Sequence, residues 1–368
     1  MARDGAGAAV LNLLFLIDGA RIEVGEAQVL RLASALRSRG HGVVIGASGR
    51  SAVDEIASRG HTVVRIPGWP NLPGAVAAIA RACREHSIDL VNAYSPQMLL
   101  FAGVASGLRR VRSALVATVD RVPSRKGTGF ERILLERLPD QVVFSSLADR
   151  DQLAELWGRA VGQVVHSGIE LPRPGATEPI DLEAKLGVPR DARVIGVVGT
   201  LAPEKAVGDA IAALVRLPED VCLCIVGDGP EENALRAEVH RRRLERRVFF
   251  AGPSTETDRY LVSFCALVLP SRYERLPAEL LRAGALSIPV VAADVGGVRE
   301  VVVPRETGVL YPTGDVDGLV RAIRGMLEDP SRAAALGCAA RQRIASVFGI
   351  ERWAAETEAL FEHVARRD

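Results

Sequence analysis

Short runs of apolar residues alternate along the whole chain with longer segments in which apolar residues recur every three or four positions. The short runs are typical of buried strands, and the longer segments are typical of amphipathic helices that cover a sheet. This alternation predicts an α/β fold with parallel sheets wrapped by helices. In the first half the expected strands are Leu11–Ile17, Gly42–Ala47, Thr62–Arg65, Leu90–Ala93, Ser113–Thr118 and Gln141–Ser145.

The alternation stops once, between Ser167 and Asp181, where three prolines fall within a segment of little periodicity. Proline cannot continue a helix or a central strand, so this segment predicts a linker between domains. The alternation then resumes, and we expect two doubly wound, Rossmann-like domains at residues 1–172 and 173–349, followed by a last helix at 350–366. The expected strands of the second half are Val194–Val198, Cys222–Val226, Val248–Ala251, Ala266–Leu269 and Val290–Ala292.

Length and charge narrow the class of protein further. The 368 residues suffice for two domains that each bury a core. The 46 basic and 45 acidic residues nearly cancel, which argues against a nucleic-acid-binding protein, because phosphates require a surplus of positive charge. No apolar run reaches the roughly 20 residues that cross a bilayer. The first residues lack the cationic end of a signal peptide, so we expect a cytoplasmic protein.

Cysteine and histidine offer no obvious chemistry. The five cysteines are an odd number and are scattered, which predicts buried free thiols in a reducing compartment. The six histidines are dispersed and lack the spacing of metal ligands, so we expect no metal site.

Ligands of doubly wound sheets bind beyond the carboxyl ends of the strands, so the cleft between two such domains is the expected place for chemistry. The first strand of the second half is followed by G-T-L-A-P-E-K, which ends on Lys205. The chain has only three lysines against 43 arginines, and an ammonium retained in this background suits a phosphate group. A lysine left there by chance is the alternative.

Three further loops hold polar or glycine-rich segments. The loop L-P-S-R-Y-E places the carboxylate of Glu274 before a helix, where it can accept hydrogen bonds from sugar hydroxyls. The pair Gly296 and Gly297 precedes another helix and offers backbone amides to an anion, as do the glycines around Gly25 in the first half. For the glycines, a turn that simply requires glycine is the competing interpretation.

In order and spacing these loops resemble those of retaining glycosyltransferases of family 4, which have the GT-B fold. The second half carries most of the likeness, in the segments G-T-L-A-P-E-K, I-V-G-D-G-P, L-P-S-R-Y-E, I-P-V-V-A-A-D-V-G-G-V-R-E and E-T-G-V-L-Y-P-T-G-D. The first half is similar but looser. The closing F-G-I-E-R-W-A-A-E-T resembles the family's last helix, which crosses back to the first domain.

The resemblance implies that the second domain binds a nucleotide-sugar donor and the first domain an acceptor. It also implies sugar transfer with retention of configuration, usually without a metal, and with no cofactor besides the donor itself. Lys205 would hold the donor diphosphate, and Glu274 would contact the donor sugar. The amides around Gly25 would also approach the diphosphate, and Gly296 and Gly297 would line the donor site.

The chain departs from the family's pattern at the expected donor site. Thr200 stands where a basic residue is usual, which removes one positive charge from the diphosphate pocket. Arg282 replaces the second carboxylate of the family's E-x7-E pair, and a guanidinium cannot accept hydrogen bonds from ribose hydroxyls. Glu279, one turn earlier, is an imperfect substitute. Arg275 stands where a small residue is usual, although Leu276 matches a common variant.

The first domain departs from the pattern as well. Asp120 stands where the family commonly has a histidine near the reacting carbon. A carboxylate there can still accept a proton or stabilise a positively charged transition state, so we treat Asp120 as a candidate catalytic residue beside Glu274. Asn92 and Tyr94 also stand where histidines are typical.

Two explanations are consistent with these departures. The chain is an active transferase with rearranged donor recognition, in which Arg275 and Arg282 compensate for the charge lost at Thr200. Alternatively, it is a catalytically impaired relative that acts as a partner subunit or binding module. The retained Lys205 and Glu274 favour the active enzyme.

The sequence leaves the acceptor open between a lipid-linked and a small molecule. The stretch from Arg109 to Arg137 carries eight basic residues. Such a stretch fits either a peripheral contact with anionic headgroups at the inner membrane face or an ordinary solvated surface.

Overall fold

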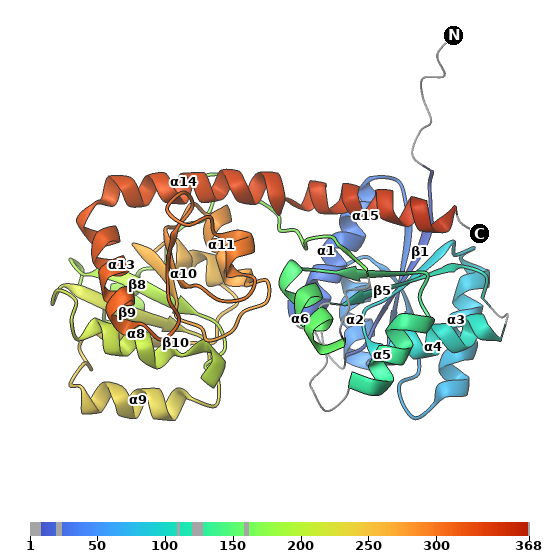
Figure 1. Ribbon diagram of the computed structural model, residues 1–368, viewed down its shortest axis with the longest axis horizontal. Helices are drawn as coiled ribbons and strands as arrows, with labels where there is room; N and C mark the ends of the chain where they lie inside the picture. Colours follow the sequence, from blue (N-terminus) through green and yellow to red (C-terminus); the bar gives the residue numbers. More distant parts are fainter. Residues whose placement is uncertain (1–8, 20–23, 109–110, 120–127, 158–161, 367–368) are drawn as a thin grey trace, which may run out of the picture. The chain divides into compact units, whose positions relative to one another are not determined.

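The computed structural model describes residues 9–19, 24–108, 111–119, 128–157 and 162–366, and it forms two compact units (Figure 1). The first unit consists of residues 1–168 and 350–368, and the second unit consists of residues 169–349. The last helix therefore belongs to the first unit, and along the chain the second unit is inserted into the first.

The first unit contains a parallel sheet of seven strands in the order β3-β2-β1-β4-β5-β6-β7. Its strands are β1 (Asn12–Ile17), β2 (Gly42–Ala47), β3 (Thr62–Arg65), β4 (Leu90–Ala93), β5 (Ala114–Val119), β6 (Gln141–Phe144) and β7 (Gln163–Val164). Its helices are α1 (Val24–Ser38), α2 (Arg50–Ser58), α3 (Leu72–Glu85), α4 (Pro96–Gly107), α5 (Thr128–Arg137), α6 (Leu147–Trp157) and α15 (Ile350–Ala365).

The second unit contains a parallel sheet of six strands in the order β10-β9-β8-β11-β12-β13. Its strands are β8 (Arg193–Val198), β9 (Val221–Val226), β10 (Val248–Gly252), β11 (Ala266–Leu269), β12 (Val290–Ala293) and β13 (Val309–Tyr311). Its helices are α7 (Leu182–Leu186), the 3-10 helix η1 (Pro203–Lys205), α8 (Val207–Leu214), α9 (Glu232–Arg241), α10 (Thr257–Leu261), α11 (Ala278–Ala285), α12 (Val298–Val301), α13 (Val316–Glu328) and α14 (Pro330–Val347).

In both sheets the strand order reverses beside the unit's first strand. β1 pairs with β2 on one side and with β4 on the other, and β8 pairs in the same way with β9 and β11. This is the strand order of a Rossmann fold, and the predicted architecture of two Rossmann-like units is confirmed. At such a reversal the loops that follow two neighbouring strands diverge to opposite faces of the sheet and leave a crevice between them.

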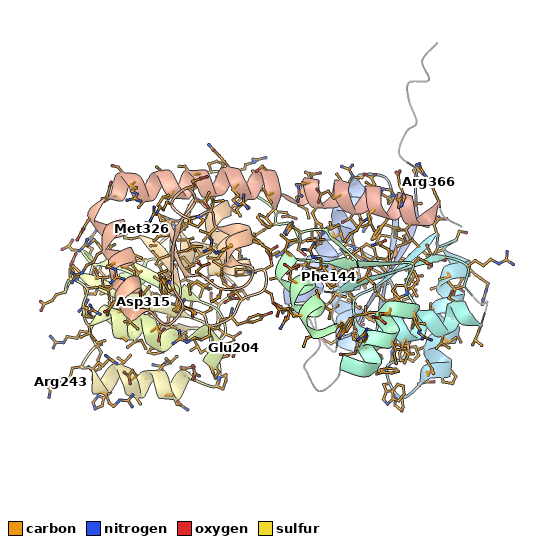
Figure 2. The ribbon with its side chains drawn as sticks, viewed as in Figure 1. Phe144, Glu204, Arg243, Asp315, Met326 and Arg366 are labelled. Atoms are coloured by element: carbon orange, nitrogen blue, oxygen red, sulfur yellow. The ribbon has the colours of Figure 1, made fainter. Side chains whose placement is uncertain are left out.

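Both faces of each sheet are buried, as expected for parallel strands with apolar residues at nearly every position. In β9 all six residues are buried. In the first unit one face of the sheet packs against α3 and α4, and the other packs against α1, α2 and α15. Phe144 and Met326, labelled in Figure 2, belong to the cores of the first and second units respectively.

The expected strands are present with ends that differ by at most one residue. The strands β7 and β13 were not predicted, since two and three residues are too few to show a periodic pattern. The expectation of buried thiols is wrong for Cys265 and Cys338, which are exposed. Cys265 stands just before β11, and Cys338 lies on the solvent-facing side of the amphipathic helix α14.

A charge cluster of Arg39, His41 and Glu358 connects α15 to the rest of the first unit. The Glu358 carboxylate accepts hydrogen bonds from Arg39 Nε and from His41 Nε2, each at 2.8 Å. His41 Nδ1 accepts the N–H of Leu11 at 3.1 Å, which places the imidazole proton on Nε2, facing Glu358. Burial opposes the ionisation of Glu358, but the hydrogen bonds from Arg39 and His41 outweigh it and lower the pKa of this carboxyl.

Replacing Glu358 with alanine should destabilise the first unit by about 2–3 kcal/mol, because two donors lose a buried charged acceptor while Arg39 keeps some access to water. Denaturant unfolding measures the loss. The loss of stability should have its full size above pH 4.5, the ordinary pKa of a glutamate. It should disappear as the pH falls through the lower pKa that Glu358 has in the folded state. Glu356→Ala breaks an exposed pair with Arg352 on the same helix and should cost less than about 0.5 kcal/mol. An equal loss of stability in Glu358→Ala and Glu356→Ala would contradict the stabilising role of the Arg39–His41–Glu358 cluster.

Candidate functional site

The loops after β8 and β11, the two neighbouring strands at the reversal of the second sheet, bring charged side chains to one point. The loop after β8 ends in η1, which carries Lys205. The loop after β11 passes through Ser271 and reaches Glu274. Lys205 and Glu274 therefore lie together at the carboxyl edge of the sheet, where Rossmann-like sheets bind ligands.

Lys205 and Glu274 form an ion pair in which Nζ lies 2.7 Å from Oε1. The hydroxyl of Ser271 donates a hydrogen bond to the same oxygen at 2.6 Å. The side chains of Lys205 and Glu274 are 19% and 7% exposed, so the lysine is the more accessible member of the pair. The two donors compensate the carboxylate for the water that it loses on burial.

A second carboxylate, Glu279 in the first turn of α11, faces the same lysine. Its Oε1 is close to the backbone of Gly199, where a Cβ would stand 3.0 Å away. Desolvation raises the pKa of Glu279; the charge of Lys205 opposes this shift, and the charge of Glu274 adds to it. Burial would lower the pKa of Lys205, but the charges of Glu279 and Glu274 outweigh it and raise this pKa. The site thus holds one cation between two acids.

Gly296 and Gly297 pack directly on the backbone of the Glu274 loop. A Cβ on Gly296 would lie 1.9 Å from the carbonyl oxygen of Glu274, and a Cβ on Gly297 would lie 1.7 Å from that of Arg275. The N–H of Gly297 donates to the Glu274 carbonyl at 3.0 Å. Only glycine allows this approach, so the pair has a structural role in fixing the Glu274 loop.

The other donor-site candidates of the second unit lie around this cluster. Thr200 is exposed, and Leu276 packs against the core of the unit. Arg275 is partly buried. The Nε of Arg282 lies 2.9 Å from Oδ1 of Asp258 in α10, with both side chains more than a third exposed. The guanidinium that replaces the family's second carboxylate is thus paired with an acid of the neighbouring helix.

The first unit contains the candidates Asp120 and Gly25, and the departures from the family pattern at Asn92 and Tyr94. Asp120 lies outside the described residues, and its catalytic role stays a prediction. Gly25 lies in the first turn of α1. Asn92 is buried in β4, and its Oδ1 accepts a hydrogen bond from the Thr118 hydroxyl at 2.9 Å.

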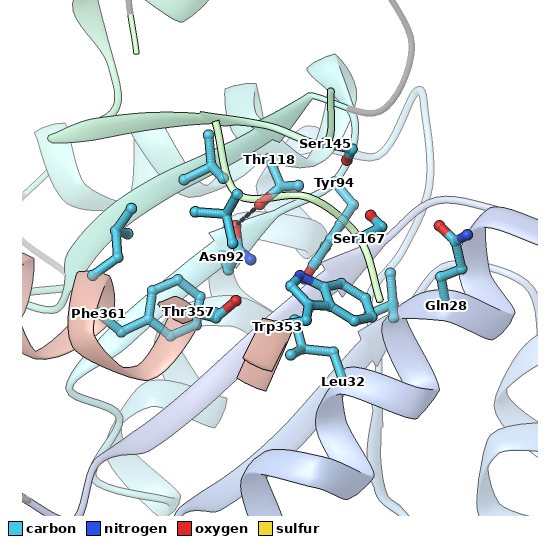
Figure 3. Close-up of a pocket in the computed structure, with 14 residues that line it drawn as sticks. Gln28, Leu32, Asn92, Tyr94, Thr118, Ser145, Ser167, Trp353, Thr357 and Phe361 are labelled. Carbon is cyan, nitrogen blue, oxygen red and sulfur yellow. Dashed lines mark hydrogen bonds between the residues drawn. The ribbon is translucent and has the colours of Figure 1, made fainter. Parts of the chain in front are cut away.

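Asn92 lines a small pocket between the first sheet, α1 and α15 (Figure 3). Tyr94, Trp353 and Thr357 also line it. The pocket has a free volume of about 20 Å³, which matches one water molecule and is too small for a sugar ring. A larger hollow of about 590 Å³ includes Asp89 and Ser113, which stand at the amino ends of β4 and β5. That edge of a Rossmann-like sheet is opposite to the edge that binds ligands.

Two members of this region were missed in the sequence. Ser271 lies three residues before Glu274 in the same loop. A hydroxyl so close in sequence to the carboxylate could have indicated the hydrogen bond between them. Asp258 belongs to a different helix from its partner Arg282, and no local pattern joins them.

Two Rossmann-like units in one chain are the architecture of the GT-B class of fold. The model of "Glycosyltransferase Family 4" matches residues 25–173, and that of "Glycosyl transferases group 1" matches residues 180–343. The chain therefore belongs to the GT-B glycosyltransferases of the family 4 type.

Named relatives and solved structures agree with this membership. Glycogen synthase of Mycobacterium tuberculosis is 35% identical over 223 residues, which cover 58% of this chain and 52% of the synthase. The match thus spans about half the length of that relative. The 2-deoxystreptamine glucosyltransferase of Streptomyces kanamyceticus is 29% identical over 262 residues, covering 69% of this chain and 68% of that protein. Anabaena HepE, solved with UDP, shares the fold with a TM-score of 0.82 and 24% identity, over 95% of this chain and 100% of HepE.

The raised pKa of Glu279 has a consequence for stability. The folded chain binds a proton at Glu279 more tightly than the unfolded chain, so this contribution is present below pH 4.5 and is lost as the pH rises through the folded-state pKa. We expect Glu279→Gln to gain stability relative to the native chain as the pH rises from about 4 to about 8. Thermal unfolding across that range measures the difference. Glu219→Gln, at an exposed carboxylate of the same unit, is the control, and an identical pH dependence in both variants would contradict the assignment.

Proposed function

We propose that this chain transfers a sugar from a nucleotide-sugar donor to an acceptor hydroxyl with retention of configuration. The observation that carries the proposal is the Lys205–Glu274 pair at the carboxyl edge of the second sheet. Membership of the glycosyltransferase family supports it. In the reaction, the bond between the anomeric carbon and the diphosphate oxygen breaks. The nucleoside diphosphate leaves with the electron pair of that bond, a bond to the acceptor oxygen forms, and the proton of the acceptor hydroxyl passes to the departing diphosphate.

The chain's own residues have distinct parts in this proposal. The Lys205 ammonium, the more accessible member of its pair, stabilises the negative charge of the departing diphosphate. Glu274, held by Ser271, orients the hydroxyls of the donor sugar. With both acids ionised the cluster carries a net negative charge, and the raised pKa of Glu279 favours its neutral form, which reduces that charge. Asp120 is proposed to act near the anomeric centre.

The nucleotide is proposed from the structural neighbours. HepE was solved with UDP and with UDP-glucose, so a uridine nucleotide is the first donor to test. The proposal requires no metal and no cofactor. The alternative of a non-catalytic partner subunit gains no support from the site, because the ion pair and the glycines that fix it are intact.

The acceptor is proposed to be a small or lipid-linked alcohol, met on the cytoplasmic side of the membrane. No helix of the described chain is long and apolar enough to span a bilayer. Phe130 and Ile133 on α5 lie one turn apart and are 59% and 55% exposed. Exposed apolar side chains within the basic stretch 109–137 suit a peripheral contact with an anionic membrane surface.

Replacing Lys205 with alanine, or Glu274 with glutamine, should reduce kcat/KM at least about 100-fold, because each removes a group that acts on the donor. Turnover of UDP-glucose, UDP-N-acetylglucosamine and GDP-mannose is measured by released nucleotide, and NMR of the product reports the anomeric configuration. Lys185→Ala, at an exposed lysine of the same unit, is the matched control and should keep full activity. Full activity in Lys205→Ala would refute its role. Binding without turnover by the native chain would favour the non-catalytic alternative.

Replacing both Phe130 and Ile133 with serine should weaken binding to vesicles that contain phosphatidylglycerol, since the apolar part of the contact is lost. Sedimentation with vesicles measures the bound fraction. Val215→Ser, at an exposed apolar residue of the second unit, should leave it unchanged. Absence of binding by the native chain would contradict the proposed membrane contact.

A further inference from the structure

Arg272 links the two loops that carry Lys205 and Glu274. Its backbone N–H donates to the carbonyl of Glu204, the residue before Lys205, at 2.7 Å; Glu204 is labelled in Figure 2. Its guanidinium forms two hydrogen bonds with Asp209 in the first turn of α8, from Nη1 to Oδ2 at 2.6 Å and from Nη2 to Oδ1 at 3.0 Å. One residue of the Glu274 loop thus holds the Lys205 segment on both sides of the lysine.

The segment that Arg272 holds contains an unfavourable turn. Ala206, directly after Lys205, has a φ of +47°, in the left-handed region that residues with a side chain rarely adopt. Such a conformation costs free energy and persists only where the surrounding structure maintains it. The two links of Arg272 lie on either side of this turn. The hydroxyl of Thr313 fixes the other loop in turn, by donating to the carbonyl of Ser271 at 3.2 Å.

The Arg272–Asp209 pair is specific in geometry but only partly buried. The Arg272 side chain is 45% exposed and that of Asp209 is 17% exposed. Two parallel hydrogen bonds fix the relative orientation of the two groups, and the hydrogen bonding to Asp209 raises the pKa of Arg272. Pairs with this much access to water contribute little to overall stability, so the fold of the unit does not depend on it.

We propose that Arg272 and Asp209 are positioning residues that hold the Lys205 ammonium at Glu274 in the geometry that binds the donor diphosphate. The inference rests on the proposed function. A lysine side chain has four rotatable bonds, and a free segment would present its ammonium correctly for only part of the time. Donor affinity falls in proportion to that fraction, although Arg272 itself touches no part of the donor.

The chain contains a matched pair elsewhere in the same unit. Arg193 also binds Asp220 through two hydrogen bonds, here from Nε to Oδ2 at 2.6 Å and from Nη2 to Oδ1 at 2.9 Å. Their side chains are 35% and 50% exposed. Arg193 is the first residue of β8 and stands at the opposite edge of the sheet from Lys205. It serves as a control for the loss of such a pair without an effect on the site.

The first test compares Arg272→Gln with Arg193→Gln in the full chain. Calorimetric titration with UDP and turnover of UDP-glucose are measured for both. We expect Arg272→Gln and Asp209→Asn to lose about tenfold or more in affinity and in kcat/KM, and Arg193→Gln to stay within about twofold of the native chain. The exchanged pair, Arg272→Asp with Asp209→Arg, should recover part of the loss. Equal behaviour of Arg272→Gln and Arg193→Gln would overturn the proposal.

A second test needs no donor, so it separates this inference from the proposed function. Amide hydrogen exchange over residues 200–210 reports whether the Lys205 segment is held, since the N–H groups of Lys205 and Ala206 are bonded only to carbonyls within the same turn. Exchange there should rise in Arg272→Gln and stay unchanged in Arg193→Gln. Unchanged exchange in both would overturn the inference. Exchange could rise in Arg272→Gln while the native chain binds no nucleotide. That result would support the role of Arg272 in holding the Lys205 segment and would contradict the proposed nucleotide-sugar donor.

Discussion

The ion pair between Lys205 and Glu274 is the interaction on which the site of the second unit depends. Removing two charges from water is costly, and the cost is offset only where further hydrogen bonds satisfy the groups. Ser271 provides one such bond, and the glycines at 296 and 297 let a third loop close on the Glu274 backbone. Loops that follow three different strands are thereby drawn to one point at the carboxyl edge of the sheet.

A lysine occupies the centre of this site although the chain strongly prefers arginine, and the chemistry of the two side chains gives a reason. Two arginines of the same loops and helix form ion pairs with acids, Arg272 with Asp209 and Arg282 with Asp258. A planar guanidinium that forms two parallel hydrogen bonds with a carboxylate, as Arg272 does with Asp209, is fixed in orientation. An ammonium is compact and has three rotatable donors, so it can be shared between protein carboxylates and an anionic ligand. Whether Arg282 compensates for the missing basic residue at Thr200 stays a prediction, and in the structure its guanidinium is paired with Asp258.

The sequence was sufficient to predict the alternating strands and helices of both units. Apolar runs located the longer strands, and Lys205 and Glu274 were found in the loops that follow two of them. Three kinds of feature were not accessible. The strands β7 and β13 are too short for a periodic signal, and the exposure of Cys265 depends on where the edge of a strand falls. The pairing of Arg282 with Asp258 joins two helices whose packing no local pattern specifies.

The insertion of the second unit within the first has a consequence for synthesis on the ribosome. Residues 169–349 form one uninterrupted segment with its own sheet and cores, so this unit has all its parts before the chain is finished. The first unit, although it begins earlier, must wait for α15, whose Trp353, Leu360 and Phe361 complete the apolar face against α1. Until then that face stays open to solvent. The half that is made first is therefore the half that is completed last.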